Sequence, residues 1–206
     1  TNLLINYRYQ DLVFLLETLK QNQFDDGTLN PFKNKIDFEK VGAMGHSMGG
    51  GTTYVAMLKN SEIKAGVALD GWFFGLLDED AKTNTKKPFL HLGQEQFLDT
   101  EIEGDINFSK DGKRNFEIYN TILETNEESY GVYIKKSLHY SFTDMKLIYN
   151  QGAPLSLPLD SLGEIDKKIV DNVLDKTILE FFDYVFKNTP FEFEGNHTFN
   201  NQVIFR

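Results

Sequence analysis

The stretch Lys40–Tyr54, KVGAMGHSMGGGTTY, combines a short apolar run, a serine flanked by glycines and the start of a helix-forming segment. Within it, residues 45–49, GHSMG, have the form G-x-S-x-G. A serine held at a sharp turn from strand to helix needs neighbours without side chains, because the backbone passes close to itself there. We expect Gly45 and Gly49 to provide that room. The turn would expose the Ser47 hydroxyl, as a nucleophile requires.

The surroundings of this motif indicate a fold class. G-x-S-x-G between a strand and a helix is the nucleophile elbow of α/β-hydrolases. An apolar run precedes the turn, and residues 53–58 are apolar enough for a buried helix. In an elbow, the Met48 backbone N–H and the helix N-terminus would point at a developing oxyanion. The pattern therefore predicts Ser47 as nucleophile and Met48 as an oxyanion donor, and a solvent-facing serine in a glycine-rich turn is the alternative.

Composition and charge exclude several classes of protein. The 206 residues are 40% hydrophobic and 25% charged, which suits one folded domain with a sizeable core. No apolar run reaches about 18 residues, so we expect no transmembrane helix. The net charge of −10 argues against nucleic acid as the main partner. The absence of cysteine excludes thiol nucleophiles and thiolate metal sites, and the predicted serine chemistry requires neither a metal nor a cofactor. Nothing in the composition indicates the compartment or the oligomeric state.

Hydrophobic periodicity predicts alternating helices and strands. We expect helices over residues 8–23, 49–59, 113–125, 142–149 and 167–187, and strands over residues 40–45, 63–69, 88–93 and 130–135. This alternation is typical of an α/β fold with a mainly parallel sheet flanked by helices. Residues 1–206 are expected to form a single domain, with a polar loop at 78–87 and a C-terminal tail over 189–206.

The position of the elbow in the chain is unusual for this fold. An α/β-hydrolase has several strands before its elbow strand, whereas one helix precedes it here. We therefore expect the chain to be the C-terminal part of such a domain, with the N-terminal strands missing. An abbreviated fold is the alternative.

The nucleophile needs a base, and the chain has four histidines. His139 follows the last predicted strand, in the order Ser…Asp…His that α/β-hydrolases use, and is the expected base. His46 lies within the elbow and should point away from the nucleophile's face, so we expect it to support the structure. His91 lies mid-strand between two leucines, which favours a buried histidine with satisfied hydrogen bonds. No strand end places His197 near the site.

The acid that would orient this base has more than one candidate. Asp70 follows the strand after the elbow helix, and Glu95 and Asp99 follow the next strand. The carboxyl ends of parallel strands meet at the same edge of a sheet, so either loop could reach the base. The pattern of residues leaves these alternatives open.

Two longer segments carry a family resemblance. Residues 45–74, GHSMGGGTTYVAMLKNSEIKAGVALDGWFF, and residues 138–144, LHYSFTD, resemble the platelet-activating factor acetylhydrolase family of lipoprotein-associated and intracellular phospholipases. That family has a GHSFGG-type elbow and an LDxW segment whose aspartate is the triad acid. The resemblance extends over about residues 8–187 and implies that Asp70 is the acid and His139 the base. It further implies hydrolysis of short or oxidised sn-2 acyl esters of phospholipids. Trp72, Phe73 and Phe74 lie beside Asp70 in the sequence, and we expect Trp72 and Phe73 to line an acyl pocket. Packing in the core is the alternative for these rings, and it is the expectation for Phe74.

The chain also departs from that family. Met48 stands where the family usually has phenylalanine, and the loop that supplies the family's second oxyanion donor, well before the elbow, is absent. We therefore expect the 206-residue chain by itself to be a weak catalyst. The GHSMGGG stretch and Trp72 are also similar to bacterial cutinases and polyester hydrolases, whose acid follows the later strand, near Glu95. A broad carboxylesterase or cutinase-like polyesterase, and a non-catalytic binding module, are the alternative functions.

Overall fold

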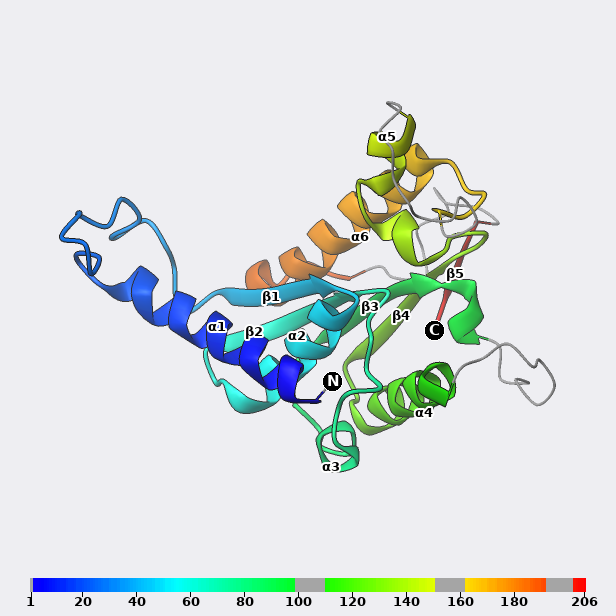
Figure 1. The fold of residues 1–206 in the computed structure, drawn as a ribbon, viewed down its shortest axis with the longest axis horizontal. Helices are drawn as coiled ribbons and strands as arrows, with labels where there is room; N and C mark the ends of the chain where they lie inside the picture. The colour runs from blue at the N-terminus through cyan, green and yellow to red at the C-terminus, as the bar shows by residue number, and fades with distance from the viewer. Residues whose placement is uncertain (1, 99–109, 151–161, 192–201) are drawn as a thin grey trace.

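The computed structural model describes residues 2–98, 110–150, 162–191 and 202–206, which form a sheet flanked by helices (Figure 1). The strands are β1 (Val41–His46), β2 (Ile63–Leu69), β3 (Phe89–Gln94), β4 (Ser129–Ile134) and β5 (Val203–Phe205). The α-helices are α1 (Asn2–Lys20), α2 (Met48–Lys59), α3 (Asp78–Ala81), α4 (Lys110–Thr125), α5 (Met145–Asn150) and α6 (Lys167–Lys187), and the 3-10 helices are η1 (Glu95–Leu98) and η2 (His139–Phe142).

The sheet has the order β1-β2-β3-β4-β5. The first four strands are parallel, and β5 is antiparallel to β4. This confirms the predicted mainly parallel α/β sheet. The register aligns the ends of neighbouring strands, with His46 opposite Leu69 and Leu69 opposite Leu92. The segments after β1, β2 and β4 therefore begin at one edge of the sheet, which is where parallel α/β folds place their sites.

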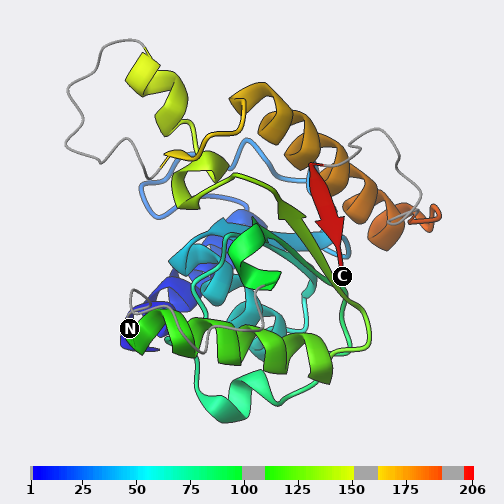
Figure 2. The ribbon, with the colours of Figure 1, turned by 90° about the vertical axis from the view of Figure 1, so that its right-hand side faces the viewer.

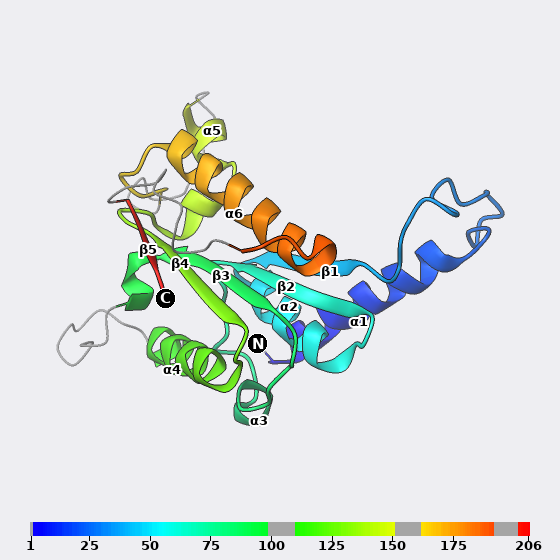
Figure 3. The same cartoon turned by 180° about the vertical axis from the view of Figure 1, so that it is seen from behind.

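Helices cover both faces of the sheet (Figures 1 and 3). Helix α6 packs on one face, where Val170, Val173 and Phe181 join a cluster with inward side chains of β2, β3 and β4. Helices α2 and α4 pack on the other face, and α1 packs against α2 (Figure 2). Because β2 and β3 are buried on both faces, their sequences are almost continuously apolar.

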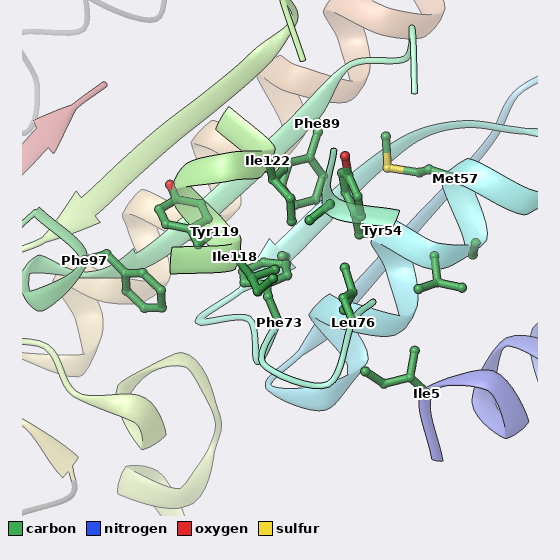
Figure 4. Packing of buried hydrophobic residues seen from close by; sticks show 14 of the residues in the cluster. Ile5, Tyr54, Met57, Phe73, Leu76, Phe89, Phe97, Ile118, Tyr119 and Ile122 are labelled. Atoms are coloured by element: carbon green, nitrogen blue, oxygen red, sulfur yellow. The ribbon is translucent and has the colours of Figure 1, made fainter. Parts of the chain in front are cut away.

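The core on the α2 and α4 side is rich in aromatic rings (Figure 4). Phe73 stacks on Tyr119 with ring centroids 5.7 Å apart, and Phe97 meets the same tyrosine edge-on at 5.1 Å. The loop that follows β2 therefore has part of its length anchored in the core. None of the described helices combines the length and apolar character needed to cross a bilayer.

Several element boundaries differ from the prediction. Helix α1 begins at Asn2, well before the expected residue 8, and α3 lies in the expected polar loop. The helix expected over 142–149 begins later, as α5, because Thr143 is extended with φ −135° and ψ 171° and Phe142 ends the separate helix η2. The expected C-terminal tail contributes strand β5 to the sheet.

Candidate active site

The elbow holds Ser47 in an uncommon backbone conformation. Ser47 has φ 61° and ψ −124° between β1 and α2, and such a positive φ is unfavourable for a residue with a side chain. Its N–H donates to the Leu69 carbonyl at 2.9 Å, which ties the turn to the neighbouring strand. Although Ser47 occupies the N-cap position of α2, its side chain makes no capping hydrogen bond. The hydroxyl is therefore available to another partner.

The glycines of the motif allow close approach at particular points. A Cβ atom on Gly45 would lie 2.5 Å from the Gly49 carbonyl, and one on Gly51 would lie 2.4 Å from the Trp72 carbonyl oxygen. A Cβ on Gly49 would meet nothing within 4 Å. The expectation that Gly49 lacks a side chain to make room is therefore wrong, because the crowding is at Gly45. Gly51 instead lets the start of α2 pass close to the loop after β2.

A chain of hydrogen bonds joins residues from three segments at the carboxyl edge of the sheet. His139 in η2 has Nε2 3.0 Å from Ser47 Oγ and Nδ1 2.5 Å from Asp70 Oδ2. A carboxylate only accepts, so the imidazole proton lies on Nδ1 and Nε2 accepts from the serine hydroxyl. In this tautomer the imidazole can take the Ser47 proton, while the carboxylate faces the charge that would form.

The Asp70 carboxylate is 1% exposed and has further donors. The Gln94 backbone N–H donates to Oδ1 and its side-chain Nε2 donates to Oδ2, both at 3.2 Å. A buried carboxylate requires such partners, because an unpaired buried charge is very costly. Sequence reasoning missed Gln94. The available signal was that β3, which pairs with β2, ends in a polar side chain next to the position of Asp70 after β2.

The other candidate acids have different positions. Glu95 Oε1 accepts a hydrogen bond from the Lys136 backbone N–H at 3.0 Å, where Lys136 turns with φ 59° after β4. Asp99 and His197 lie outside the described residues. Of the two loops considered from sequence, the one carrying Asp70 is therefore the one that contacts His139.

Aromatic rings from two other segments contact His139, in addition to the adjacent Tyr140 ring at 5.4 Å. His46 Nε2 donates to the His139 carbonyl at 2.9 Å, and the two rings have centroids 4.5 Å apart. Burial lowers the pKa of His46, and the nearby His139 lowers it further. Trp72 stacks on His139 at 5.0 Å with an interplanar angle of 16°. The His46 bond ties β1 to η2, as a supporting residue would, but the ring lies against His139 rather than pointing away from the site as expected.

The two aromatic residues expected to line an acyl pocket lie in different surroundings. Trp72 is 38% exposed beside His139, whereas Phe73 is fully buried in the aromatic core. Phe74 is half-buried and contacts Trp72, with ring centroids 5.7 Å apart. The expectation for this pair is therefore wrong: Phe74, expected in the core, accompanies Trp72, and Phe73, expected in the pocket, packs in the core.

His91 differs in part from the expectation of a fully satisfied core histidine. Its Nε2 accepts from the Gly71 backbone N–H at 3.2 Å, but Nδ1 is buried with no partner among the described residues. Burial lowers the pKa of His91 to about 4, so the ring is neutral near pH 7.

Comparisons with known proteins identify the relatives of this chain. The family model described as platelet-activating factor acetylhydrolase, isoform II, matches residues 15–196. Curated platelet-activating factor acetylhydrolases from Gallus gallus and Cavia porcellus are 26% and 25% identical over 152 and 153 residues. Each alignment covers 74% of this chain but 32% and 31% of the relative, so the chain spans about a third of their length.

A solved structure shows the same fold. A ferulic acid esterase from Streptomyces cinnamoneus superposes with a TM-score of 0.74 and 22% identity, covering 99% of this chain and 55% of the esterase. This likeness shows the α/β-hydrolase fold that the elbow motif predicted. Because the family model spans most of its residues, the chain belongs to the platelet-activating factor acetylhydrolase family, isoform II.

Proposed function

We propose that this protein is a serine hydrolase that cleaves carboxylic esters through an acyl-enzyme on Ser47. The observation that carries the proposal is the unbroken hydrogen-bond chain from Ser47 Oγ through His139 to the buried Asp70 carboxylate. Nucleophile, base and orienting acid occur here in the geometry and tautomer that acyl transfer requires.

Each residue has a defined role in the proposed reaction. His139 Nε2 takes the hydroxyl proton as Ser47 Oγ attacks the acyl carbonyl, and the Asp70 carboxylate stabilises the imidazolium. The Met48 N–H is the first amide of α2, a position without an intrahelical acceptor, and donates to the tetrahedral oxyanion. The imidazolium then protonates the leaving alcohol. Water, activated by the same imidazole, hydrolyses the acyl-enzyme and regenerates the serine.

The substrate class in this proposal is a phospholipid with a short or oxidised acyl chain at sn-2. Membership of the family supports it, and the relatives are named for the deacetylation of platelet-activating factor. Trp72 and the half-buried Phe74 provide an apolar surface beside His139 that would contact the acyl chain. Phe73 is omitted from this surface because it is fully buried.

Labelling with a fluorophosphonate probe, followed by a substrate panel, tests the proposal. We expect labelling at Ser47 that is abolished by Ser47→Ala and by His139→Ala. Ser47→Ala is a suitable control because the serine side chain makes no capping bond that its loss would break. An unlabelled Ser47 would identify a non-catalytic binding module. Labelling together with a preference for simple or polymeric esters over sn-2 acetyl phospholipid would identify a broad carboxylesterase or polyesterase instead.

A further inference from the structure

Residues 70–74, called the acid loop below, carry Asp70 and Trp72 to His139. Each of the loop's five backbone N–H groups donates a hydrogen bond to another part of the fold. Two of the acceptors are backbone carbonyls: the Asp70 N–H bonds the Leu92 oxygen at 2.7 Å and the Trp72 N–H bonds the Ser47 oxygen at 2.8 Å. The loop is thus attached directly to β3 and to the elbow.

The remaining three acceptors are supplied by two buried side chains. His91 Nε2 accepts from the Gly71 N–H, and Asn115 Oδ1 accepts from the N–H groups of Phe73 and Phe74. Asn115 Nδ2 also donates to the Gly71 carbonyl at 3.2 Å. The backbone of Gly71, directly after Asp70, is therefore held by β3 through its N–H and by α4 through its carbonyl.

The surroundings of His91 fix its ring in one orientation. The ring lies 4.3 Å from Tyr119 and 4.6 Å from Phe97, centroid to centroid. A Cβ atom on Gly93 would lie only 2.6 Å from His91 Cε1, so the absence of a side chain there makes room for the imidazole. Because the neutral ring accepts at Nε2, its proton is on Nδ1, which has no partner among the described residues.

A histidine at this position is less favourable for folding than an apolar residue would be, because its Nδ1–H is buried without a partner among the described residues. Burying an N–H group without a hydrogen-bond acceptor is unfavourable, because the group loses its bond to water. In return, the Gly71 N–H gains an acceptor in a place where water is excluded. Asp70 itself has φ 44°, an unfavourable conformation that persists only when its surroundings hold it.

We propose that His91 is a positioning residue, whose acceptance of the Gly71 N–H holds the Asp70 carboxylate against His139. This role rests on the proposed function of the triad. Without the acceptor, the buried Gly71 N–H has to turn toward another partner, and the adjoining Asp70 turns with it. A displacement of about 1 Å in such a group can reduce a rate about a hundredfold.

Three substitutions at His91 separate this role from simple packing. His91→Leu retains an apolar side chain of similar bulk but removes the acceptor. His91→Gln places an amide oxygen near the position of Nε2. His91→Asn has the same amide one methylene shorter and cannot reach Gly71, so it replaces His91→Leu if that variant does not fold. Tyr119→Phe is the control, since this ring packs on His91 and its hydroxyl bonds Tyr133 rather than the acid loop.

Two measurements apply to all four variants: the downfield proton NMR signal of the His139 Nδ1–H bonded to Asp70, and the rate constant for fluorophosphonate labelling of Ser47. We expect His91→Leu and His91→Asn to lose the signal and to label about 10- to 100-fold more slowly. His91→Gln should keep the signal and label within about threefold of the wild-type rate, as Tyr119→Phe should.

The outcomes distinguish this inference from the proposed function. A wild-type signal and labelling rate in His91→Leu or His91→Asn would overturn the positioning role. Equal losses in His91→Gln, His91→Asn and Tyr119→Phe would also overturn it, because they would show that packing alone matters. If wild-type Ser47 is not labelled but the NMR signal follows the expected pattern, the positioning role stands and the proposed hydrolase function fails.

Discussion

Two loops at the carboxyl edge of the sheet each begin with a carboxylate, and only one of them contacts His139. The loop after β2 begins with Asp70, which is 1% exposed and bonded to the imidazole. The segment after β3 begins with Glu95, which is half-buried and bonds the Lys136 N–H at the turn after β4. Proximity to the sheet edge therefore does not by itself determine which carboxylate orients the base.

The two loops differ in the hydrogen bonds that neighbouring segments make to them. Asp70 accepts two hydrogen bonds from Gln94, and the backbone after it is held by His91 and Asn115. Strand β3 thus provides donors to the Asp70 carboxylate and an acceptor for the backbone after it, while Asp70 itself follows β2. A buried carboxylate is stable where such partners converge, and in the described residues they converge on Asp70.

The largest expected effect comes from exchanging the two carboxylates for amides. Asp70→Asn should reduce the rate of ester hydrolysis by about 10⁴-fold, the loss seen in serine proteases when the triad acid becomes an amide. Glu95→Gln should change it less than about threefold, because its partner is a backbone N–H on another turn. Steady-state kinetics on a short acyl ester measure both. A larger loss in Glu95→Gln than in Asp70→Asn would reverse the comparison.

The second prediction concerns the pH dependence of stability. The pKa of His91 is 6.5 when unperturbed and about 4 in the folded protein, because of burial. As the pH falls from 6.5 towards 4, the unfolded chain binds a proton that the folded protein does not. Folding should therefore lose up to about 3 kcal/mol from this group. Urea unfolding of wild-type and His91→Gln protein across that range should show a shallower pH dependence in the variant.

The control for this measurement is Tyr119→Phe, which keeps His91 and should retain the wild-type pH dependence. Titrating groups common to all three proteins cancel in the comparison. Parallel curves for wild type and His91→Gln would mean that His91 is protonated in the folded protein over this range.

The third prediction tests the support that Asp70 receives from the other loop. Gln94→Met removes the side-chain donor to Asp70 Oδ2 and leaves the backbone donor to Oδ1. A hydrogen bond to a charged group contributes about 1.5 kcal/mol or more, so we expect about a tenfold lower kcat with little change in KM. Gln96→Met, at an exposed position nearby, is the matched control and should be unaffected. Equal kinetics in the two variants would contradict a role for Gln94.

The smallest expected effect comes from removing the Trp72 side chain that stacks on the His139 imidazole. Trp72→Ala removes the indole that stacks on His139, and such aromatic pairs contribute about 0.5–1.5 kcal/mol. We expect activity to fall about two- to tenfold, with most of it kept in Trp72→Phe, which retains a ring. If Trp72→Phe is as impaired as Trp72→Ala, contact with substrate rather than stacking on His139 explains the loss.

Local patterns predicted much of the fold and of the site. The strand at 63–69 and the helix at 167–187 have the expected bounds, because continuous apolar runs and a single apolar stripe define them. The G-x-S-x-G motif and the order of residues indicated Ser47 and His139, which lie 3.0 Å apart in the structure. These features depend on neighbours within a few residues or on the order of strands.

Other features depended on contacts between distant segments. The side chains of Gln94 and Asn115 act on the acid loop across 24 and 44 residues of sequence, and no local pattern marks them. The partial burial of Phe74 and the full burial of Phe73 likewise follow from the path of the acid loop across α4, which two adjacent phenylalanines in a sequence do not reveal.

The sequence by itself determined the elbow, the strands and helices around it, and a short list of carboxylates for the base. It did so because steric rules and hydrophobic periodicity act locally along the chain. The residue pattern left Asp70 and Glu95 open and the family resemblance favoured Asp70, but only the tertiary structure shows why Asp70, and not Glu95, meets His139. That choice depends on where buried donors and acceptors from β3 and α4 converge, and a buried charge is stable only where they do.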